Sequence, residues 1–254
     1  MYDLGAGSGA VTLALVARGF DPARITAVDA GPWGWVWAAM GEGRFDVGAL
    51  AALLAEATDR PPSTVKAWVE GDLARRPPTP EGFVVLQAAS FGATPVWHDG
   101  ASWRRGGGAR TYAARSHWTP GPGSPETQPR GTLFAPARIL AAAGEAARRL
   151  PGLDGRCARA EGIAFAPGAA VYVDPPYEGA EGYGFAMDWR TLLDRHRPVF
   201  VFANLAALAA YDWPADSATS RHAAPPAAAA PPATLAAIRP PVGMSTAIQT
   251  ASAN

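Results

Sequence analysis

A glycine-rich stretch directly after the first apolar residues constrains the fold of this chain more than any other feature. Tyr2 to Leu4 is short and apolar, and Gly5, Gly7 and Gly9 follow before an apolar segment from Ala10 to Val16. Glycines let the backbone turn tightly and let a cofactor approach without a side-chain clash, and the next helix begins with free N–H groups. The stretch predicts a strand–loop–helix unit that suits a dinucleotide or S-adenosylmethionine, or else a tight turn without a ligand.

Strand-like and helix-like segments alternate along the rest of the chain. The expected strands are Ile25 to Val28, Phe83 to Leu86, Ala170 to Val173 and Val199 to Phe202. The expected helices are Trp33 to Met40, Val47 to Ala57 and Pro136 to Leu150. This alternation predicts an α/β fold with a parallel sheet and right-handed crossovers. After Tyr211 we expect few residues able to form further strands, because Ala223 to Ala237 is an Ala/Pro-rich run that need not fold.

The composition excludes several classes of protein. The chain has 254 residues, 48% of them hydrophobic, which is enough for one α/β core with an insert. Its single cysteine, Cys157, excludes an intrachain disulfide framework and a cysteine-based zinc cluster, and the four histidines lack metal-ligand spacing. We therefore expect no metal. Without a run of about 20 apolar residues or a secretory signal, we expect a cytoplasmic protein that does not enter a membrane.

Asp29 ends the second expected strand, about 20 residues after the glycines. A carboxylate at this position can accept hydrogen bonds from both ribose hydroxyls of an adenosine. It can equally cap the segment that follows. The ribose interpretation depends on the glycine-rich stretch beside it.

Asp174-Pro175-Pro176-Tyr177 follows the apolar strand Ala170 to Val173. Ligands of open α/β sheets bind at the carboxyl ends of the strands, and the two prolines stiffen this turn. The Asp174 carboxylate and the Pro175 carbonyl can each accept one N–H of an amino group, while Tyr177 offers a flat face to a base. Such a pocket orients the amine lone pair toward an electrophilic methyl group, so catalysis would rest on positioning.

These residues carry a family resemblance. Asp-Pro-Pro-Tyr is the catalytic motif of amino-methyltransferases, and its surroundings resemble the DNA adenine methylases, which include many phage enzymes. Asp3-Leu4-Gly5-Ala6-Gly7-Ser8-Gly9-Ala10-Val11 is similar to their cofactor loop, which has an acidic residue followed by Pro-Phe-Ala-Gly-Ser-Gly-Ala-Val. The motif order, with the cofactor loop before a variable insert and Asp-Pro-Pro-Tyr after it, also agrees. The resemblance covers about residues 1 to 205.

The resemblance implies a Rossmann-like S-adenosylmethionine-dependent methyltransferase sheet with an inserted target-recognition region. The implied catalytic residues are Asp174, Pro175, Pro176 and Tyr177. The implied cofactor-binding residues are Asp3, Gly5, Ala6, Gly7, Gly9, Asp29 and Asp174. Three departures bear on activity, one of which is that the family's final strands are hard to identify after Val199 to Phe202. Gly5 replaces the usual Phe, which removes an aromatic wall near the cofactor, and the family carries a lysine-containing segment before the point where this sequence begins.

An arginine-rich stretch separates the two motifs, and from about Thr94 to Gly131 glycines and prolines interrupt the alternation, so we expect no regular structure there. Residues 101 to 160 contain ten Arg and only three acidic residues, although the whole chain has no net charge. Arginines interleaved with tryptophans suit phosphate contact and base stacking, so we expect residues 94–135 to recognise the target. The alternative is a solvated loop from biased coding. The candidate substrate-binding residues are Ser90, Phe91, Trp97, Arg104, Arg105 and Arg110.

The chain thus divides into residues 1–93 (cofactor part), 94–135 (insert), 136–214 (catalytic part) and 215–254 (low-complexity tail). The resemblance implies a monomeric enzyme, encoded by a bacterium or phage, that methylates adenine N6 in double-stranded DNA. Methylation of an RNA base amine and a truncated, inactive remnant that binds only nucleic acid remain as alternatives. A nicotinamide-dependent dehydrogenase would explain the glycines alone.

Overall fold

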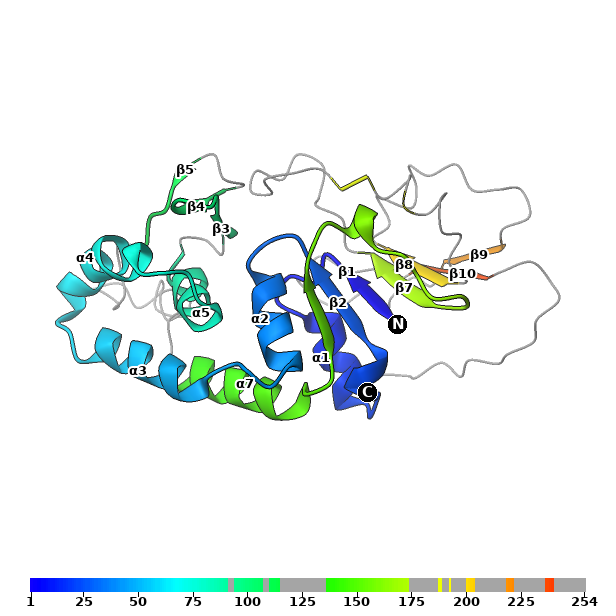
Figure 1. The fold of residues 1–254 in the computed structure, drawn as a ribbon, viewed down its shortest axis with the longest axis horizontal. Coiled ribbons are helices and arrows are strands. Elements are labelled where there is room, and N and C mark those ends of the chain that lie inside the picture. Colours follow the sequence, from blue (N-terminus) through cyan, green and yellow to red (C-terminus); the bar gives the residue numbers. More distant parts are fainter. Residues whose placement is uncertain are drawn as a thin grey trace.

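One sheet with helices packed against it forms the core of the protein in a computed structural model (Figure 1). The structure describes residues 1–90, 94–106, 110–114, 136–173, 187–188, 192, 200–203, 218–221 and 236–239. Within this part the predicted fold class is confirmed at the level of an α/β protein whose parallel sheet is flanked by helices, consistent with a Rossmann-like fold. No helix in the same part is long and apolar enough to cross a membrane.

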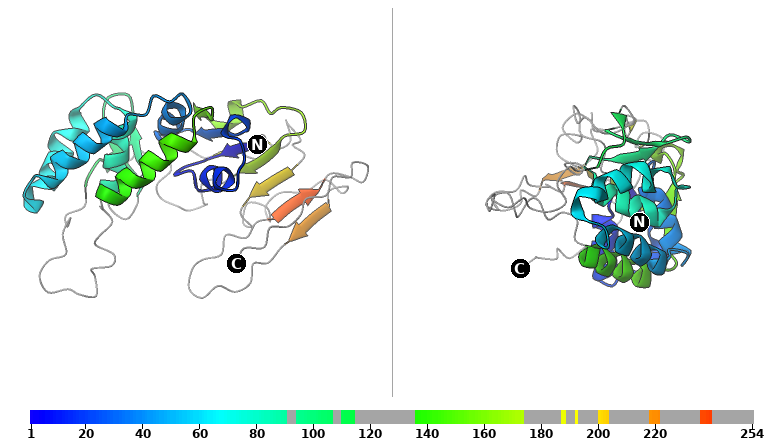
Figure 2. Two further views of the ribbon diagram at one scale, coloured as in Figure 1. Left: turned by 90° about the horizontal axis from the view of Figure 1, so that it is seen from below. Right: turned by 90° about the vertical axis from the view of Figure 1, so that its left-hand side faces the viewer.

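The main sheet has the strand order β6-β2-β1-β7-β8-β10-β9. Its strands are β1 (Tyr2–Leu4), β2 (Thr26–Asp29), β6 (Asp154–Cys157), β7 (Ala170–Val173), β8 (Phe200–Ala203), β9 (Ala218–Arg221) and β10 (Ala236–Arg239). Neighbouring strands from β6 to β8 are parallel, whereas β10 is antiparallel to both β8 and β9 (Figure 2). Because the chain runs from β1 toward β6 on one side and toward β8 on the other, the topological switch point lies between β1 and β7.

In the described part of the chain, six longer helices lie against the main sheet or beside it. They are α1 (Ala10–Ala17), α2 (Trp33–Gly41), α3 (Val47–Thr58), α4 (Pro62–Gly71), α5 (Pro80–Ala89) and α7 (Pro136–Arg149), with short 3-10 turns at Pro22–Arg24, Leu73–Arg75 and Ala160–Gly162. Helix α2 packs so closely on β6 that a Cβ at Gly155 would lie 2.2 Å from the Trp37 carbonyl carbon. A Cβ at Gly41 would lie 1.9 Å from the Leu153 oxygen. Glycine is therefore required at both positions of this contact.

A second lobe lies on the other side of α2 from the sheet (Figure 1). It contains α3, α4, α5 and a small antiparallel sheet of β3 (Val96–His98), β4 (Trp103–Arg105) and β5 (Arg110–Thr111). We expected residues from about 94 to 131 to lack regular structure, and for residues 96–111 this expectation is wrong where the structure describes them. The small sheet is anchored to α5, because the buried Tyr112 hydroxyl donates to the Leu86 carbonyl at 2.9 Å.

Aromatic rings join the lobe to the core. On α2, Trp33 stacks with Trp37 at 5.7 Å between centroids and meets Phe83 of α5 edge-on at 5.1 Å. Phe83 in turn stacks on Trp103 of β4 at 6.0 Å, and Trp35 of α2 contacts the same ring. Phe83 is fully buried and Trp103 nearly so. Large buried rings contribute strongly to packing, so this cluster fixes α5 and the small sheet against α2.

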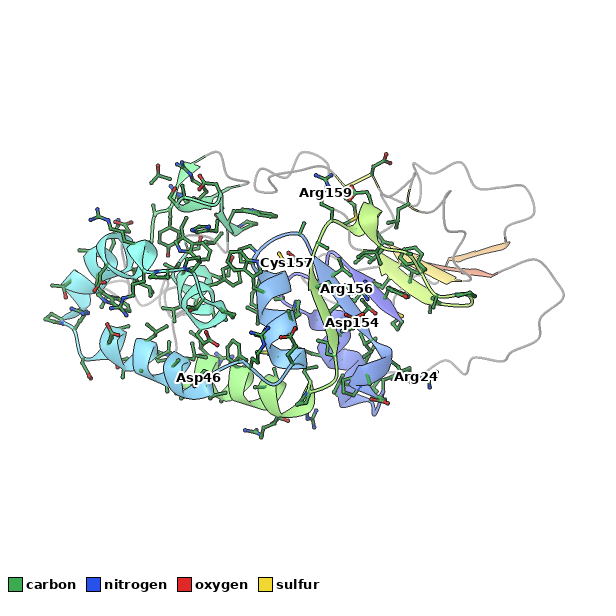
Figure 3. All side chains as sticks on the ribbon, viewed as in Figure 1. Arg24, Asp46, Asp154, Arg156, Cys157 and Arg159 are labelled. Atoms are coloured by element: carbon green, nitrogen blue, oxygen red, sulfur yellow. The ribbon has the colours of Figure 1, made fainter. Side chains whose placement is uncertain are left out.

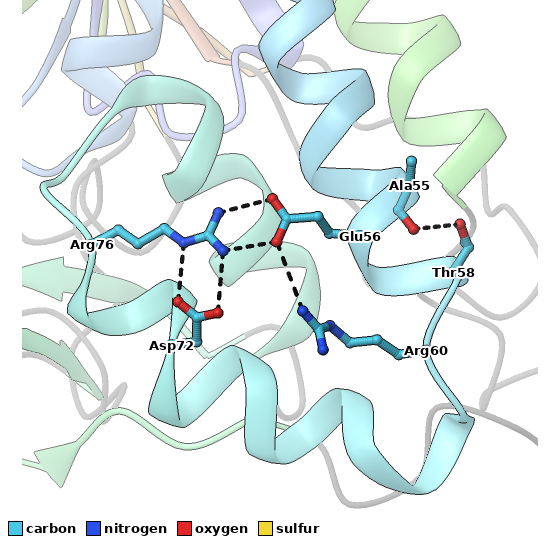
Figure 4. A network of polar contacts seen from close by, with 6 residues as sticks. All are labelled: Ala55, Glu56, Thr58, Arg60, Asp72 and Arg76. Carbon is cyan, nitrogen blue, oxygen red and sulfur yellow. Dashed lines mark hydrogen bonds and ion pairs between the residues drawn. The ribbon is translucent and has the colours of Figure 1, made fainter.

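Ion pairs tie the outer helices of the lobe together (Figure 4). The Arg76 guanidinium donates to both Glu56 carboxylate oxygens at 3.0 and 2.7 Å and to both Asp72 oxygens at 3.2 Å. Hydrogen bonds from Arg76 lower the pKa values of Glu56 and Asp72. Arg60 and Arg76 both lie over the Trp68 ring, at 5.2 and 5.9 Å from its centroid. These pairs are partly exposed, so their contribution is modest and orients α3 relative to α4.

Two further predictions about secondary structure are wrong. Phe83 to Leu86 belongs to helix α5 rather than to a strand. The Thr79 hydroxyl accepts a hydrogen bond from the Gly82 N–H at 3.0 Å, and Pro80 occupies the first turn, so the helix has a strong start. We also expected few strands after Tyr211, but β9 and β10 both lie there, and β10 begins inside the Ala/Pro-rich run. Pairing with β8 stabilises strands there despite their composition.

Candidate functional site

The predicted glycine loop connects β1 to α1 at the switch point of the sheet. Gly5, Gly7 and Gly9 have φ values of 73°, 48° and 77°, a region that residues with a Cβ rarely adopt. The N–H groups of Gly5 and Ala6 both donate to the Val28 carbonyl of β2, at 2.9 and 3.0 Å. The loop thus turns across the end of β2 with its backbone held close to the sheet.

Trp37 of α2 contacts the same loop and stabilises it. Its indole Nε1 donates to the Gly7 carbonyl at 2.9 Å. A Cβ at Gly9 would lie only 2.4 Å from the Trp37 ring, so the absence of a side chain at Gly9 lets α2 approach. Trp37 is 2% exposed, and sequence reasoning did not assign it a role at the loop.

Asp29 binds the loop from the end of β2. Its Oδ2 accepts a hydrogen bond from the Gly7 N–H at 2.9 Å and its Oδ1 accepts one from the Gly31 N–H at 2.7 Å. Burial raises the pKa of the Asp29 carboxyl, and the hydrogen bonds from Gly31 and Gly7 oppose that rise. Each carboxylate oxygen retains a second lone pair, so the group can hold the loop and also accept a ribose hydroxyl. The capping interpretation and the ribose interpretation are therefore compatible.

Asp3 fixes the start of α1. It is 2% exposed, and its Oδ2 accepts hydrogen bonds from the Thr12 N–H at 3.1 Å and from the Thr12 hydroxyl at 2.7 Å. Asp3 also borders the cavity described next. Sequence reasoning missed Thr12, although a hydroxyl residue in an otherwise apolar helix was a usable signal for a buried polar partner.

A cavity of about 730 Å³ opens beside the loop. This volume lies within the usual range of small-molecule sites. The cavity is bordered by the glycine loop and Asp29 at the sheet, and by residues of α2, α5, β3 and α7. Lining residues that bear on function are Asp3, Gly5, Ala6, Gly7, Asp29, Gln87, Ser90, Trp97 and Tyr172. Most of the predicted cofactor residues thus line one cavity. Gly9 does not line it, but its lack of a side chain leaves room for Trp37 against the loop.

The end of α5 and the start of β3 form the opposite wall. The Gln87 amide donates to the Thr94 carbonyl at 3.1 Å and accepts from the Val96 N–H at 3.0 Å. Ser90, a predicted substrate residue, is buried and donates through Oγ to the same Thr94 carbonyl at 2.9 Å. Sequence reasoning did not assign Gln87 a role, but both Gln87 and Ser90 position the strand that carries Trp97.

The predicted arginines belong to the strands of the small sheet, and of those whose side chains the structure describes, Arg104 and Arg105 do not line the cavity. Arg104 forms an ion pair with Asp99 at 2.7 Å. Arg105 of β4 stands opposite Arg110 of β5, and the Arg105 Nε is buried without a hydrogen-bond partner. Arg104 is the register partner of Trp97 in the neighbouring antiparallel strand, so these two side chains leave the small sheet on the same face.

Carboxylates offset part of the local arginine surplus. Arg148 and Arg149 of α7 both pair with Glu145. On the edge strand β6, Arg156 pairs with the adjacent Asp154 at 2.6 Å (Figure 3). Exposed pairs of this kind are weak, but they reduce the charge available to phosphates. The predicted basic surface is therefore less concentrated than the sequence count implies.

Several predicted residues lie outside the described part of the chain. These are Phe91 and the catalytic set Asp174, Pro175, Pro176 and Tyr177. The strand that leads to the catalytic set is described: Val173 of β7 is the register partner of Leu4 in β1. The residue after Leu4 opens the glycine loop and the residue after Val173 is Asp174. The two motifs therefore follow adjacent parallel strands at the same edge of the sheet.

Two comparisons complete the description of the site. A scan against models of known protein families finds no match, and no curated protein matches the sequence. Among the described residues, no group of three or more His, Cys, Asp or Glu side chains is arranged to hold a metal ion. The functional argument therefore rests on the geometry of this chain and on its motifs.

Proposed function

We propose that this protein is an S-adenosylmethionine-dependent methyltransferase that acts on the exocyclic amine of a nucleic-acid base, N6 of adenine in DNA. One observation carries the proposal. The glycine loop and the Asp29 carboxylate meet at the switch point of a doubly wound sheet, directly beside the strand that leads into Asp174-Pro175-Pro176-Tyr177. Ligands of such sheets bind at this point.

The residues present fit a nucleoside cofactor. The Gly5 and Gly7 backbone borders the cavity without side chains, and Asp29 offers free lone pairs beside it. The first turn of α1 begins directly after the loop, with N–H groups near the same space. When bound, S-adenosylmethionine supplies an electrophilic methyl group. Loop backbone and Asp29 would hold its adenosine part.

The Asp-Pro-Pro-Tyr segment would position the target. Its Asp174 carboxylate and Pro175 carbonyl would accept the two N–H groups of the base amine, and Tyr177 would stack on a base flipped from the duplex. The amine nitrogen would then bond to the methyl carbon as the carbon–sulfur bond breaks, and the nitrogen would afterwards release a proton to solvent. No strong base is needed for this order of events, so positioning is the main contribution of the protein.

The sheet argues against the dehydrogenase alternative. Dinucleotide-binding domains use six strands in the order 3-2-1-4-5-6 in a mostly parallel sheet. Here the antiparallel β10 lies between β8 and β9, and the sequence adds Asp-Pro-Pro-Tyr, which a nicotinamide enzyme leaves unexplained. An RNA base amine remains the second candidate target, because the same four residues suit either nucleic acid.

Calorimetric titration with S-adenosylmethionine, followed by a methyl-transfer assay, tests the proposal. We expect micromolar binding and transfer to adenine N6 in duplex DNA. The Asp174→Ala variant should lose transfer by at least about 100-fold, because the amine loses its principal acceptor. Asp59→Ala, which removes an exposed carboxylate at the end of α3, is the matched control and should transfer at the wild-type rate.

Each outcome separates the candidates. Transfer to folded RNA but not to duplex DNA would replace the DNA target by an RNA base. Absence of cofactor binding by the wild-type chain would leave the inactive remnant as the better account. Equal transfer by Asp174→Ala and wild type would show that the proposed amine pocket is wrong.

A further inference from the structure

We propose that Trp97 forms the aromatic wall of the nucleoside end of the cavity and stacks on the adenine ring of the cofactor. This inference rests on the proposed function and deepens it. From sequence, Trp97 belonged to the residues expected to contact the target nucleic acid. The structure brings its ring to the cofactor side of the cavity instead.

The position of the Trp97 ring is fixed relative to Asp29. A Cβ built at Gly31 would lie 3.0 and 3.1 Å from two carbons of the Trp97 six-membered ring and 3.1 Å from the Asp29 Oδ1. Gly31 also donates its N–H to that same Oδ1 at 2.7 Å. The indole therefore lies beside the carboxylate that is proposed to bind the ribose. In a nucleoside the base is attached directly to the ribose, so the base would occupy the space next to this ring.

The end of helix α5 holds the backbone that leads to Trp97. The Gln87 side chain accepts the N–H of Val96, the residue before Trp97, and Val96 is 2% exposed. Gln87 also binds the Thr94 carbonyl, which receives the Ser90 hydroxyl as well. Trp97 is thus presented by a strand whose start is fixed by three hydrogen bonds, so the backbone that carries its ring is positioned before a ligand binds. Such pre-organisation favours binding.

The chemistry of the ring suits adenine. When an aromatic residue that stacks on a base is replaced by alanine, binding weakens roughly 5- to 150-fold. The glycine loop offers no aromatic group of its own, because Gly5 stands where the resembling enzymes carry Phe. An indole from β3 on the opposite wall would supply the missing stacking surface.

A functional consequence follows from the strand pairing. Trp97 is the register partner of Arg104 in β4, so one small sheet carries both the proposed adenine wall and the arginines proposed to contact nucleic acid. Cofactor binding that restrains this sheet would favour nucleic-acid binding, and linkage requires the reverse effect to be equal.

Calorimetric titration of three ligands tests the inference. The ligands are S-adenosylmethionine, 5′-methylthioadenosine, which keeps the nucleoside, and methionine, which lacks it. Trp97→Ala should weaken binding of the two nucleoside ligands by about 5- to 150-fold, and Trp97→Phe by less than about fivefold because a stacking face remains. Phe20→Ala, which removes an exposed ring that does not line the cavity, is the control and should leave cofactor binding unchanged. Titration of the wild type should also quench tryptophan fluorescence more than titration of Trp97→Phe.

The outcomes distinguish this inference from the proposed function. If the wild type binds S-adenosylmethionine and both Trp97 variants bind it equally well with unchanged quenching, Trp97 does not contact the cofactor while the function stands. If Trp97→Ala binds the cofactor normally but loses nucleic-acid binding, Trp97 contacts the target instead and the inference is overturned. If the wild type binds neither nucleoside ligand, both the function and the inference fail. Thermal unfolding of each variant without ligand checks that the fold persists, and Trp97→Phe decides the matter if Trp97→Ala does not fold.

Discussion

The two walls of the cavity are built in different ways. The glycine loop is held through its own backbone N–H groups, since those of Gly5 and Ala6 donate to the Val28 carbonyl and that of Gly7 donates to the Asp29 carboxylate. The opposite wall at β3 is held by side chains from elsewhere, notably Gln87 and the stacked ring of Trp103. The turn itself is specified by three glycines within a short segment and is held by the end of β2 and by Trp37, whereas the position of Trp97 depends on packing between α5, α2 and the small sheet.

Phe83→Ala should have the largest effect on this comparison. The ring is fully buried between Trp33 and Trp103, so its removal leaves a cavity and should cost about 3–5 kcal/mol in the free energy of unfolding. Urea denaturation followed by circular dichroism measures the change. Phe20→Ala, at a ring 54% exposed, is the control and should stay within about 0.5 kcal/mol. A loss below about 1 kcal/mol at Phe83 would mean that the aromatic cluster does not join the two lobes.

Gly9→Ala should have the next largest effect, because it changes a residue of the glycine loop itself. At a φ of 77° an alanine is strained, and its Cβ would lie 2.4 Å from the Trp37 ring. Backbone strain and overpacking together should lower the free energy of unfolding by about 2–4 kcal/mol. Gly19 at the other end of α1 has a φ of 88° but nothing within 4 Å of an added Cβ. Gly19→Ala should therefore lose only the strain, about 1–2 kcal/mol. Equal losses in the two variants, measured by urea denaturation, would show that Trp37 yields without cost.

The smallest effect is a pH dependence from Asp29. Burial raises the pKa of its carboxyl above the unfolded value of about 4, so the folded chain retains this proton to a higher pH than the unfolded chain. Asp29 thus contributes stability below the unfolded pKa that is lost as the pH rises through the folded pKa. We expect the stability of the wild type relative to Asp29→Asn to fall across that interval in urea titrations. A relative stability that rises with pH would mean that the hydrogen bonds from Gly7 and Gly31 outweigh burial.

Cofactor affinity should change in the opposite direction over the same interval. Ribose hydroxyls donate hydrogen bonds to an ionised carboxylate more strongly than to a protonated one. Binding of S-adenosylmethionine to the wild type should therefore tighten as Asp29 ionises. Asp29→Asn should bind more weakly and without this dependence.

Several elements were predictable because their signals are local. The strand β1, the loop with its three glycines and the start of α1 occur within one short segment, and the structure confirms each of them. Helix α5 also carried a local signal in Thr79-Pro80-Glu81, but its short apolar run was interpreted as a strand. A brief apolar run suits either element, and the capping residues were the better guide.

Other elements had no local signal. The edge strand β6 is made of Asp154-Gly155-Arg156-Cys157, a polar sequence with little strand propensity. It forms because β2 pairs with it and because Gly155 admits α2 against its backbone. Likewise, β10 pairs with β8 across a separation that no short window covers.

The sequence by itself determined which residues can turn tightly at the end of β1, which carboxylate follows β2, and which motif follows β7. Those properties depend on the conformational range of glycine and proline and on the order of residues along the chain. Only the tertiary structure decided that Gly7 and Asp29 bind each other, that Asp3 is engaged by Thr12, and that Trp97 lies beside Gly31. Such contacts join residues on different elements, and their distances are set by how helices and strands pack.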